Sequence, residues 1–266
     1  MDEYQNIYDY VGGQKDIEEK TIRAIGNPND RFKEDALRML RALYFQAKLG
    51  FNIEKETKEA MLNNRLLIEK LAMERVHAEL IKILRGPYLK QALESMIDTK
   101  IHEVLPGLKK GIEHIVTLDE MPFIDTFFTI CFTLNLGFIP SKWTFSNRHR
   151  HKYQRASELA LKYPKHIPDE GLYHYGLEIS LLANKANFNL GLQSYQNQSL
   201  QERFNNLPLR SELDLALTSM EIVDIKNKKA GAWLGQLKND MVELVLQKKL
   251  ENTKEALTAF VRAYEV

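Results

Sequence analysis

The sequence predicts an all-α protein made of many helices, with β-structure only near its N-terminal end. Two observations support this class. From about residue 30 onward, segment after segment carries apolar residues at three- and four-residue steps, as on the buried face of a helix. Before that point, the pattern is short and strand-like and ends at Gly12 and Gly13, and two short strands do not form a stable sheet alone.

The composition is that of an ordinary globular chain. Its 266 residues are 44% apolar and 27% charged, which suits one large domain or two smaller ones. The formal net charge is only +1, so any RNA-binding surface must be a local patch. No apolar run approaches the ~20 residues that span a membrane, and Met1-Asp2-Glu3 does not begin a signal peptide.

The sequence gives little indication of a metal site or a disulfide. Cys131 is the single cysteine, which excludes an intrachain disulfide and fits a reducing cytoplasm. The seven histidines show no metal-binding spacing, because His149 and His151 are two residues apart and would point in different directions on a helix. We therefore expect no metal site in this chain.

The segment 22–49 organises the rest. Asn27-Pro28-Asn29-Asp30 breaks an apolar run, and a single long helix is expected to follow, with Asp30 as N-cap and Gly50 as the stop. Further expected elements are a helix from Asn52 to Leu62, helices over 72–84 and 87–97, a turn over 101–108, an apolar helical core over 111–139, a break at 164–168, helices over 172–182 and 190–204, and a final helix capped by Asn252-Thr253-Lys254-Glu255.

The polar face of the first long helix is unusual, because it carries Glu34, Asp35, Arg38 and Arg41. Asp35 and Arg38 are three residues apart and should emerge side by side. They can form an intrahelical ion pair that stabilises the helix by ~0.2–0.5 kcal/mol. They can also form a hydrogen-bonding edge that pairs with a nucleobase, since a carboxylate accepts and a guanidinium donates.

Five segments together resemble the bacterial CCA-adding enzymes, tRNA nucleotidyltransferases of the class that includes bacterial poly(A) polymerases. The segments are 10–17, 22–26, 31–42, 49–53 and 73–80. The resemblance implies that Asp35 and Arg38 of the Glu-Asp-x-x-Arg motif read the Watson–Crick edge of CTP or ATP. It implies that Arg41 faces the sugar or triphosphate and that Glu34 belongs to the same nucleotide-binding motif.

The resemblance also implies an elongated architecture of four parts: a remnant of a β-containing head (1–26), a neck (27–86), a body (87–205) and a tail (206–266). Five residues match structural motifs of the family, with Glu74 and Arg75 bracing the neck: Gly12, Gly13, Asp16, Glu74 and Arg75. In the tail, Gly231-Ala232-Trp233 matches a family turn in which Ala232 replaces the usual proline.

The catalytic signature of the family's head is missing from the sequence. No Asp-x-Asp pair, Gly-Ser turn or Arg-Arg-Asp motif occurs anywhere. Phosphoryl transfer needs carboxylates that hold metal ions, so no catalytic residue is expected here and the chain alone should be inactive. The intact enzyme is expected to use Mg²⁺. Either a head precedes these residues in a longer protein, or the protein has lost it.

Basic residues suggest where tRNA would bind. Arg148, Arg150 and Lys152 follow one another without an intervening acid, near the aromatic Trp143, Phe145 and Tyr153. Further candidates for phosphate contact are Arg23, Arg31, Lys228 and Lys229. A solvated basic face and a phosphate-binding face both fit, because phosphate contacts dominate nucleic-acid affinity without needing a sequence-reading motif.

Two alternatives to CCA addition stay open at this level. The template pair is shared with poly(A) polymerases and with relatives that add only CC or only A. A non-catalytic helical RNA-binding or protein-interaction module would also explain a missing head. The expected partners are tRNA, CTP and ATP, in the cytoplasm and without a membrane; the sequence does not set the oligomeric state.

Overall fold

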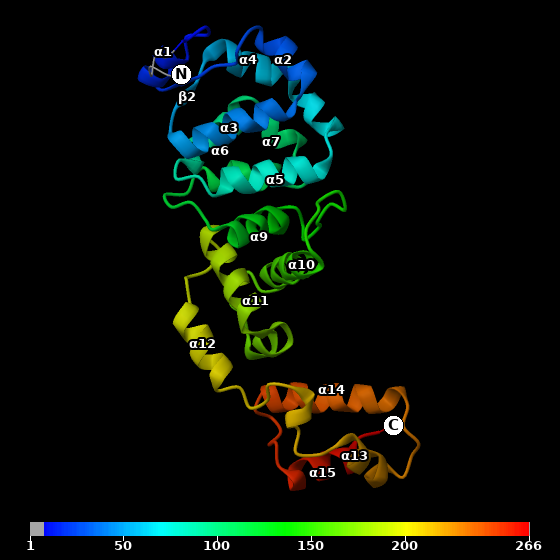
Figure 1. Cartoon of the computed structure of the whole chain (residues 1–266). Helices are drawn as coiled ribbons and strands as arrows, with labels where there is room; N and C mark the ends of the chain where they lie inside the picture. The colour runs from blue at the N-terminus through cyan, green and yellow to red at the C-terminus, as the bar shows by residue number, and fades with distance from the viewer. Residues whose placement is uncertain (1–7, 266) are drawn as a thin grey trace. The chain divides into compact units, whose positions relative to one another are not determined.

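A computed structural model describes residues 8–265, and the all-α prediction is confirmed for them. They form fifteen α-helices and two short 3₁₀ segments, with a single pair of two-residue strands (Figure 1). The strands β1 (Thr21–Ile22) and β2 (Asn52–Ile53) pair in parallel. The first part of the predicted head remnant, residues 1–7, lies outside the described residues. None of the described helices combines the length and apolar content needed to cross a membrane.

The chain divides into two compact units, the first ending at Glu158 and the second beginning at Leu159. The four-part division into head remnant, neck, body and tail remains a prediction. Each unit buries its own apolar core. In the first unit Met39, Leu40 and Leu43 are fully buried. In the second, Leu159, Leu172 and Leu237 are fully buried.

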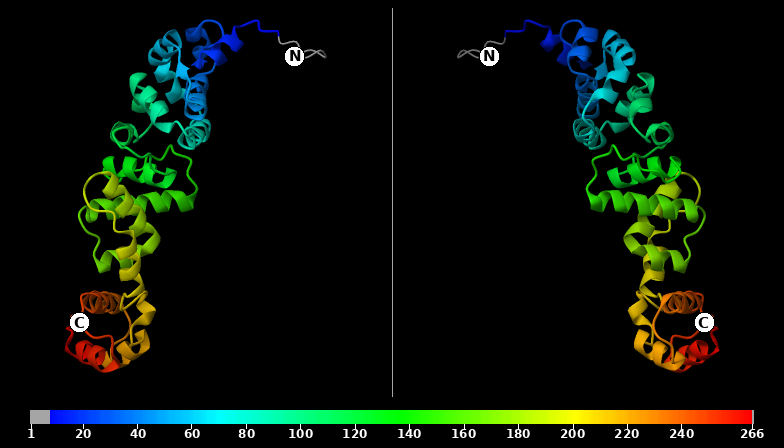
Figure 2. Two further views of the ribbon diagram at one scale, coloured as in Figure 1. Left: turned by 90° about the vertical axis from the view of Figure 1, so that its left-hand side faces the viewer. Right: turned by 90° about the vertical axis from the view of Figure 1, so that its right-hand side faces the viewer.

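The centre of the first unit is α3 (Leu37–Leu49), which packs against α5 (Met73–Leu84) and α6 (Leu89–Asp98). These helices lie side by side in the views of Figure 1 and Figure 2. The remaining elements before residue 116 are α1 (Gly13–Glu18), α2 (Pro28–Glu34), α4 (Lys55–Asn64), the 3₁₀ segment η1 (Arg65–Lys70), α7 (Ile101–Val104) and α8 (Lys109–Ile115). α2 packs on α4 and also contacts α3.

The prediction of a single helix between Asp30 and Gly50 is wrong, because the helix is interrupted at Asp35. Asn27, not Asp30, is the N-cap of α2: its side chain accepts a hydrogen bond from Asn29 N at 2.9 Å, with Pro28 at the first helical position. Asp35 then adopts an extended conformation, φ −150° and ψ 103°, and separates α2 from α3. Gly50 ends α3 with a positive φ of 69°, as predicted.

The helix predicted to start at Asn52 is also displaced. Asn52 belongs to β2, and α4 begins at Lys55 after Glu54. The reason is pairing: Asn52 N donates to Lys20 O at 2.8 Å and Glu54 N donates to Ile22 O at 3.0 Å. These bonds hold the segment 20–24 beside the start of α4, where the sequence alone showed only a capping residue.

The apolar segment 111–139 supplies core as predicted, mainly through α9 (Ile124–Leu134). The next helix, α10 (Asn147–Lys162), adds Tyr153 to this core. Phe128 packs against the rings of Phe132, Trp143 and Tyr153 at centroid distances of 5.3–6.2 Å. Cys131 is buried and free, and burial raises its pKa well above the ordinary value. Phe123 and Leu136, expected in this core, are instead 87% and 83% exposed at the two ends of α9.

The second unit holds α11 (Asp169–Asn189), α12 (Asn197–Asn205), the 3₁₀ segment η2 (Glu212–Asp214), α13 (Ser219–Lys226), α14 (Ala232–Leu246) and α15 (Lys254–Ala263). The helix predicted over 172–182 bends within that range, because Gly176 has the non-helical angles φ 76° and ψ 168°. The helix predicted over 190–204 begins only at Asn197, after a loop.

The caps define the start of two helices in the tail. Gly231-Ala232-Trp233 begins α14, with Gly231 as N-cap and Ala232 at the first helical position, where proline is also favourable. Thr253, not Asn252, caps α15 by accepting from Ala256 N at 3.3 Å. Asn252 instead binds Ala216 N at 2.9 Å and Asp214 O at 2.8 Å, and so ties down the segment 214–216.

Candidate nucleotide-binding and RNA-binding sites

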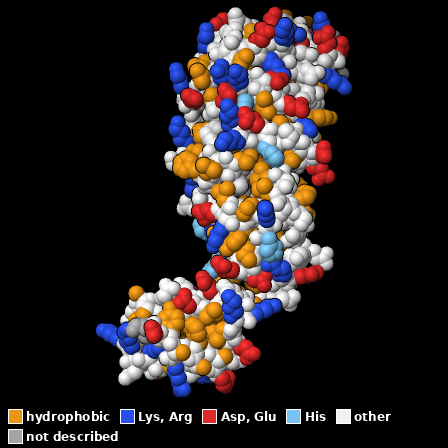
Figure 3. Space-filling model, turned by 180° about the vertical axis from the view of Figure 1, so that it is seen from behind, with side chains coloured by type: hydrophobic (Ala, Val, Ile, Leu, Met, Phe, Trp, Pro, Cys, Tyr) orange, Lys and Arg blue, Asp and Glu red, His pale blue; other side chains and the backbone are white. Residues whose placement is uncertain are grey.

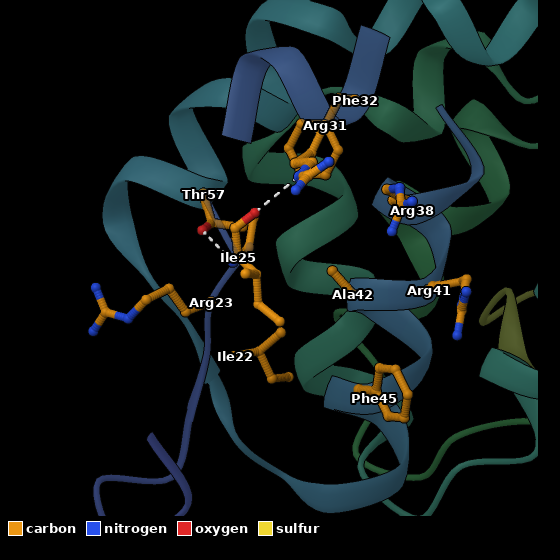
Figure 4. Close-up of a pocket in the computed structure, with 11 residues that line it drawn as sticks. Ile22, Arg23, Ile25, Arg31, Phe32, Arg38, Arg41, Ala42, Phe45 and Thr57 are labelled. Carbon is orange, nitrogen blue, oxygen red and sulfur yellow. Dashed lines mark hydrogen bonds between the residues drawn. The ribbon is translucent and has the colours of Figure 1, made fainter. Parts of the chain in front are cut away.

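A pocket of about 430 Å³ lies between α3 and the segment 22–25 in the first unit. Guanidinium groups and apolar side chains line it together, as Figure 4 shows. The apolar part includes Ile25, Phe32 and Phe45, with Ala42 on α3 between them. Arg38 and Arg41, one turn apart on α3, contribute the basic side. The pocket therefore offers apolar surface next to positive charge.

Asp35 is not one of the residues that line this pocket, but it lies three residues before the lining residue Arg38 and is held in place by two hydrogen bonds. Its Oδ1 accepts from Leu37 N at 3.0 Å, at the start of α3. Its Oδ2 accepts from Arg75 Nη2 at 3.1 Å, from the first turn of α5. The break between α2 and α3 thus fixes the carboxylate from two elements, a stronger constraint than an exposed helical residue would have.

The electrostatics keep Asp35 ionised. Partial burial by itself would raise the pKa of this carboxyl. The hydrogen bonds from Leu37 N and Arg75, with the charges of Arg75 and Arg38, outweigh that effect and lower the pKa below its ordinary value. Asp35 is therefore an acceptor at neutral pH. The influence of Arg38 also shows that the two predicted template residues are electrostatic neighbours.

Asp35 and Arg38 do not emerge side by side from one helix, although their i,i+3 spacing predicts this. Asp35 is not on the helix that carries Arg38, because it caps the break before α3. A bound carboxylate oxygen still has a free lone pair, since the two oxygens together offer about four acceptor positions. The arrangement can accept a further hydrogen bond at Asp35 while Arg38, exposed on α3, donates one.

The other predicted residues near the pocket have partners within the chain. Arg31 donates from Nε to Ile25 O at 3.0 Å and from Nη1 to Glu34 at 2.9 Å, so Arg31 and Glu34 pair with each other. Arg23 pairs with Asp16 at 3.1 Å and with Glu54, and its side chain points away from α3 in Figure 4. These two arginines and three carboxylates largely neutralise one another.

The structural-motif residues take separate positions. Gly12 has φ 76° and precedes α1, which Gly13 begins. Asp9, missed in the sequence, accepts from Gln14 N and Gly13 N at 2.9 Å each, and these bonds lower its pKa. Glu74 is exposed in the first turn of α5 beside Arg75. The contact from Arg75 to Asp35 was the site feature that sequence spacing could not reveal, because forty residues separate them.

The basic segment on α10 is less free than its sequence suggests. Lys152 Nζ lies 2.8 Å from Asp125 Oδ2 of α9, and its side chain is only 20% exposed. Tyr153 donates to the other oxygen of Asp125 at 2.8 Å. Arg150 donates to the carbonyl oxygens of Trp143 and Ser141 and so anchors that loop. Of the three predicted residues, Arg148 alone is exposed, whereas Arg150 and Lys152 are partly buried.

In the second unit Lys228 and Lys229 are exposed before α14, as expected for groups that meet solvent or phosphate. Lys226, two residues before Lys228, is partly buried and donates to the carbonyl oxygens of Arg262 and Tyr264. Basic and acidic side chains are interspersed on the face of the first unit drawn in Figure 3. No single-sign field covers that face, which agrees with the net charge of +1.

Among residues 8–265, no group of three or more His, Cys, Asp or Glu side chains is arranged to hold a metal ion. The scattered carboxylates near the pocket are occupied by arginines, as described for Asp16, Glu34 and Glu54. The donor set needed for a metal is therefore not found in the described part of the chain.

Two family models match the chain. The first, described as "Probable RNA and SrmB- binding site of polymerase A", covers residues 50–112. The second, described as "tRNA nucleotidyltransferase domain 2 putative", covers residues 126–261, about half of the chain. Together they define the class as a tRNA nucleotidyltransferase or a related polymerase.

Individual relatives narrow this class. The CCA-adding enzyme of Bacillus subtilis (strain 168) is 30% identical over 275 residues, covering 96% of this chain and 67% of the relative. The solved structure of the Bacillus stearothermophilus CCA-adding enzyme in complex with CTP superposes with a TM-score of 0.79, at 27% identity, over 98% of this chain and 69% of that one. The Thermotoga maritima enzyme complexed with tRNA shares the fold at 17% identity and a TM-score of 0.60. The chain belongs to the family of CCA-adding enzymes.

Proposed function

We propose that this chain selects the nucleotide and binds tRNA within an enzyme that adds CCA to tRNA 3′ ends. The observation that carries the proposal is the fixed Asp35 beside the exposed Arg38 at the edge of an apolar and basic pocket. The complex of the similar Bacillus stearothermophilus enzyme with CTP supports the assignment of the ligand.

The chemistry of the pair favours cytosine and adenine over uracil and guanine. Cytosine and adenine each present an amino donor next to a ring-nitrogen acceptor, whereas uracil and guanine present a carbonyl acceptor and an N–H donor. An ionised Asp35 accepts from the amino group, and Arg38 donates to the ring nitrogen. Uracil or guanine would place acceptor against acceptor and donor against donor, which leaves polar groups unpaired and is rejected.

Arg41 lies one turn beyond Arg38 on the same side of the pocket and would contact the sugar or triphosphate. Mg²⁺, expected for phosphoryl transfer in the intact enzyme, does not fit the described residues, so a nucleotidyltransferase head would have to hold it. The described residues would bind and orient the base, and they would not supply the metal-assisted step.

Binding of tRNA would use exposed basic residues of both units, among them Arg148, Lys228 and Lys229. The shape and phosphates of folded RNA suffice for such binding, and no sequence-reading motif is required. Because tRNA is its substrate, the protein would act in the cytoplasm.

The direct test is nucleotide incorporation with tRNA, CTP, ATP and Mg²⁺. The chain alone should extend no tRNA, and the chain joined to the head of a CCA-adding relative should restore extension. A fusion carrying Asp35→Ala and Arg38→Ala is the matched control and should extend poorly. Extension by the chain alone would contradict the proposal, because it requires carboxylates that the sequence does not show.

Poly(A) polymerase activity is the second candidate, since the description of one matching family model names polymerase A. The Asp35 and Arg38 pair would serve both enzymes equally. Supplying each nucleotide separately to the fused protein separates them: CCA addition consumes CTP first and stops after one adenine, whereas a poly(A) polymerase extends generic RNA with adenine alone.

A further inference from the structure

The last turn of α11 and the loop that follows it each present one aromatic ring to solvent. Phe188 is 42% exposed and Tyr195 is 47% exposed, and their ring centroids are 5.6 Å apart with planes inclined at 45°. Lys185 Nζ lies 4.4 Å from the centroid of the Tyr195 ring and 5.2 Å from that of Phe188. We call these three side chains the aromatic platform.

Hydrogen bonds from buried groups fix the backbone of the loop that carries Tyr195. Asn184, only 1% exposed, accepts from Gln196 N at 3.0 Å and donates to Ser194 O at 3.1 Å. These two bonds clamp the backbone on both sides of Tyr195. Leu192 N donates to Asn187 O at 2.9 Å, and Gly191, with φ 70°, allows the reversal between the two rings.

The charge around the platform is suited to a polyanion. Residues 179–201 contain no Asp or Glu, and Lys185 is their one charged residue. This stretch contrasts with a chain in which 27% of residues are charged. Uncharged amide side chains dominate the stretch, and two of them, Asn184 and Asn187, are buried and hydrogen-bonded within the chain.

Aromatic rings next to a cation are the chemistry that proteins use for unstacked nucleobases. Every base has a π-face, so stacking on Tyr or Phe tolerates any sequence. RNA loops supply bases whose faces are free, and a lysine beside the ring reaches the adjoining phosphate. A surface for an apolar protein partner would need no isolated lysine over its rings and gains nothing from the absence of acids.

We infer that Phe188, Tyr195 and Lys185 form a second RNA contact, which stacks one unpaired or loop-terminal nucleobase and binds its phosphate. The inference rests on the proposed function, because it takes RNA as the ligand. It adds a stacking contact to a surface that would otherwise bind tRNA through scattered basic residues. The stacking term depends little on salt, whereas the lysine term depends on it strongly.

The test is binding of the described chain to tRNA over a series of salt concentrations. Tyr195→Ala should weaken binding about 5- to 100-fold with an unchanged salt slope. Tyr195→Phe keeps the ring and should bind like the unmodified chain. Lys185→Ala should lower the salt slope by about one phosphate equivalent. Leu213→Ala, 92% exposed in the same unit, is the matched control and should change neither quantity.

The outcomes separate this inference from the function on which it rests. If the unmodified chain binds no tRNA, the proposed function fails and the inference with it. If the unmodified chain binds and both Tyr195→Ala and Lys185→Ala bind equally well, only the platform is overturned, and the surface then belongs to a different partner such as a protein. Should Tyr195→Ala unfold, Tyr195→Phe and Lys185→Ala still decide: a slope unchanged by Lys185→Ala contradicts the inference.

Discussion

The arginines of α3 and the basic residues of α10 look alike in sequence but differ in the structure. Arg38 and Arg41 are exposed at the edge of a pocket, next to a carboxylate fixed by other groups. Lys152 on α10 is paired with Asp125, and Arg150 is bound to loop carbonyls. The first region leaves its charge exposed at a pocket, whereas much of the charge in the second is paired within the fold.

The difference comes from partners that are distant in sequence. Asp125 precedes Lys152 by twenty-seven residues, so the absence of an acid within the basic segment says nothing about neutralisation. Arg75 lies forty residues after Asp35 and frees Arg38 from serving as its ion-pair partner. Counting charges along the sequence therefore overestimates the free positive charge on α10. It also misses Arg75, which holds Asp35 in place.

The largest effect is expected for Arg38→Ala. Loss of a charged hydrogen bond to the base should lower kcat/KM for CTP and ATP about 10- to 100-fold in the chain joined to a nucleotidyltransferase head. Lys33→Ala, an exposed change at the end of α2, is the matched control and should have little effect. If the two variants are equally active, Arg38 behaves as an ordinary solvated charge, and the contrast between α3 and α10 fails.

The next effect concerns stability on the α10 side. Asp125→Ala leaves the hydroxyl of Tyr153, a residue only 3% exposed, without its acceptor and Lys152 without its partner. We expect a loss of about 1–3 kcal/mol in the free energy of unfolding. Urea unfolding at pH 7 measures it. Tyr153→Phe removes one bond but keeps the ring and the ion pair, and should cost less.

The same pair gives a pH dependence. Burial acts to raise the pKa of Asp125, but hydrogen bonds from Lys152 and Tyr153 outweigh it and lower the pKa below the ordinary 3.8. The unfolded chain therefore binds the proton first as pH falls. The stability advantage over Asp125→Asn should be full above the ordinary pKa and disappear as pH falls through the lower folded value. An advantage that instead grows on acidification would contradict the pairing.

A smaller effect on stability is expected for Arg75→Ala. Arg75 and Asp35 are 52% and 35% exposed, so their ion pair should contribute less than about 1 kcal/mol. Its larger consequence is positional: Asp35 keeps only the bond from Leu37 N, so discrimination between nucleotides should fall while the melting temperature hardly changes. Arg75→Lys should restore part of the discrimination. A large drop in melting temperature would show that Arg75 only braces the fold.

The smallest expected effect is on the salt dependence of tRNA binding, and it distinguishes Arg148 from Lys152 on α10. Arg148→Ala should lower the salt slope of tRNA binding by about one, since one exposed phosphate contact is lost. Lys152→Ala should leave that slope unchanged, because Asp125 already neutralises the lysine. A lower slope for Lys152→Ala would mean that the ion pair opens when tRNA binds.

The sequence revealed the helical class because periodic burial is a local signal. It also predicted the stop at Gly50, which the positive φ of 69° confirms, whereas the template role of Asp35 and Arg38 remains a prediction from their motif. It did not reveal the break at Asp35, because the bonds that compensate for it come from Leu37 N and from Arg75. The sequence predicts Asn52 as a helix cap. It does not show that Asn52 belongs to a strand, because the pairing with the segment 20–22 is a tertiary contact.

The central claim is that Asp35 reads the base as a hydrogen-bond acceptor. The most direct measurement compares kcat/KM for CTP and UTP in the head-joined protein with Asp35 and with Asp35→Asn. The amide can turn its N–H toward the base and offer a donor to the carbonyl of uracil. We predict that the preference for CTP falls about tenfold or more. An unchanged CTP preference, with only weaker binding of both nucleotides, would contradict the claim.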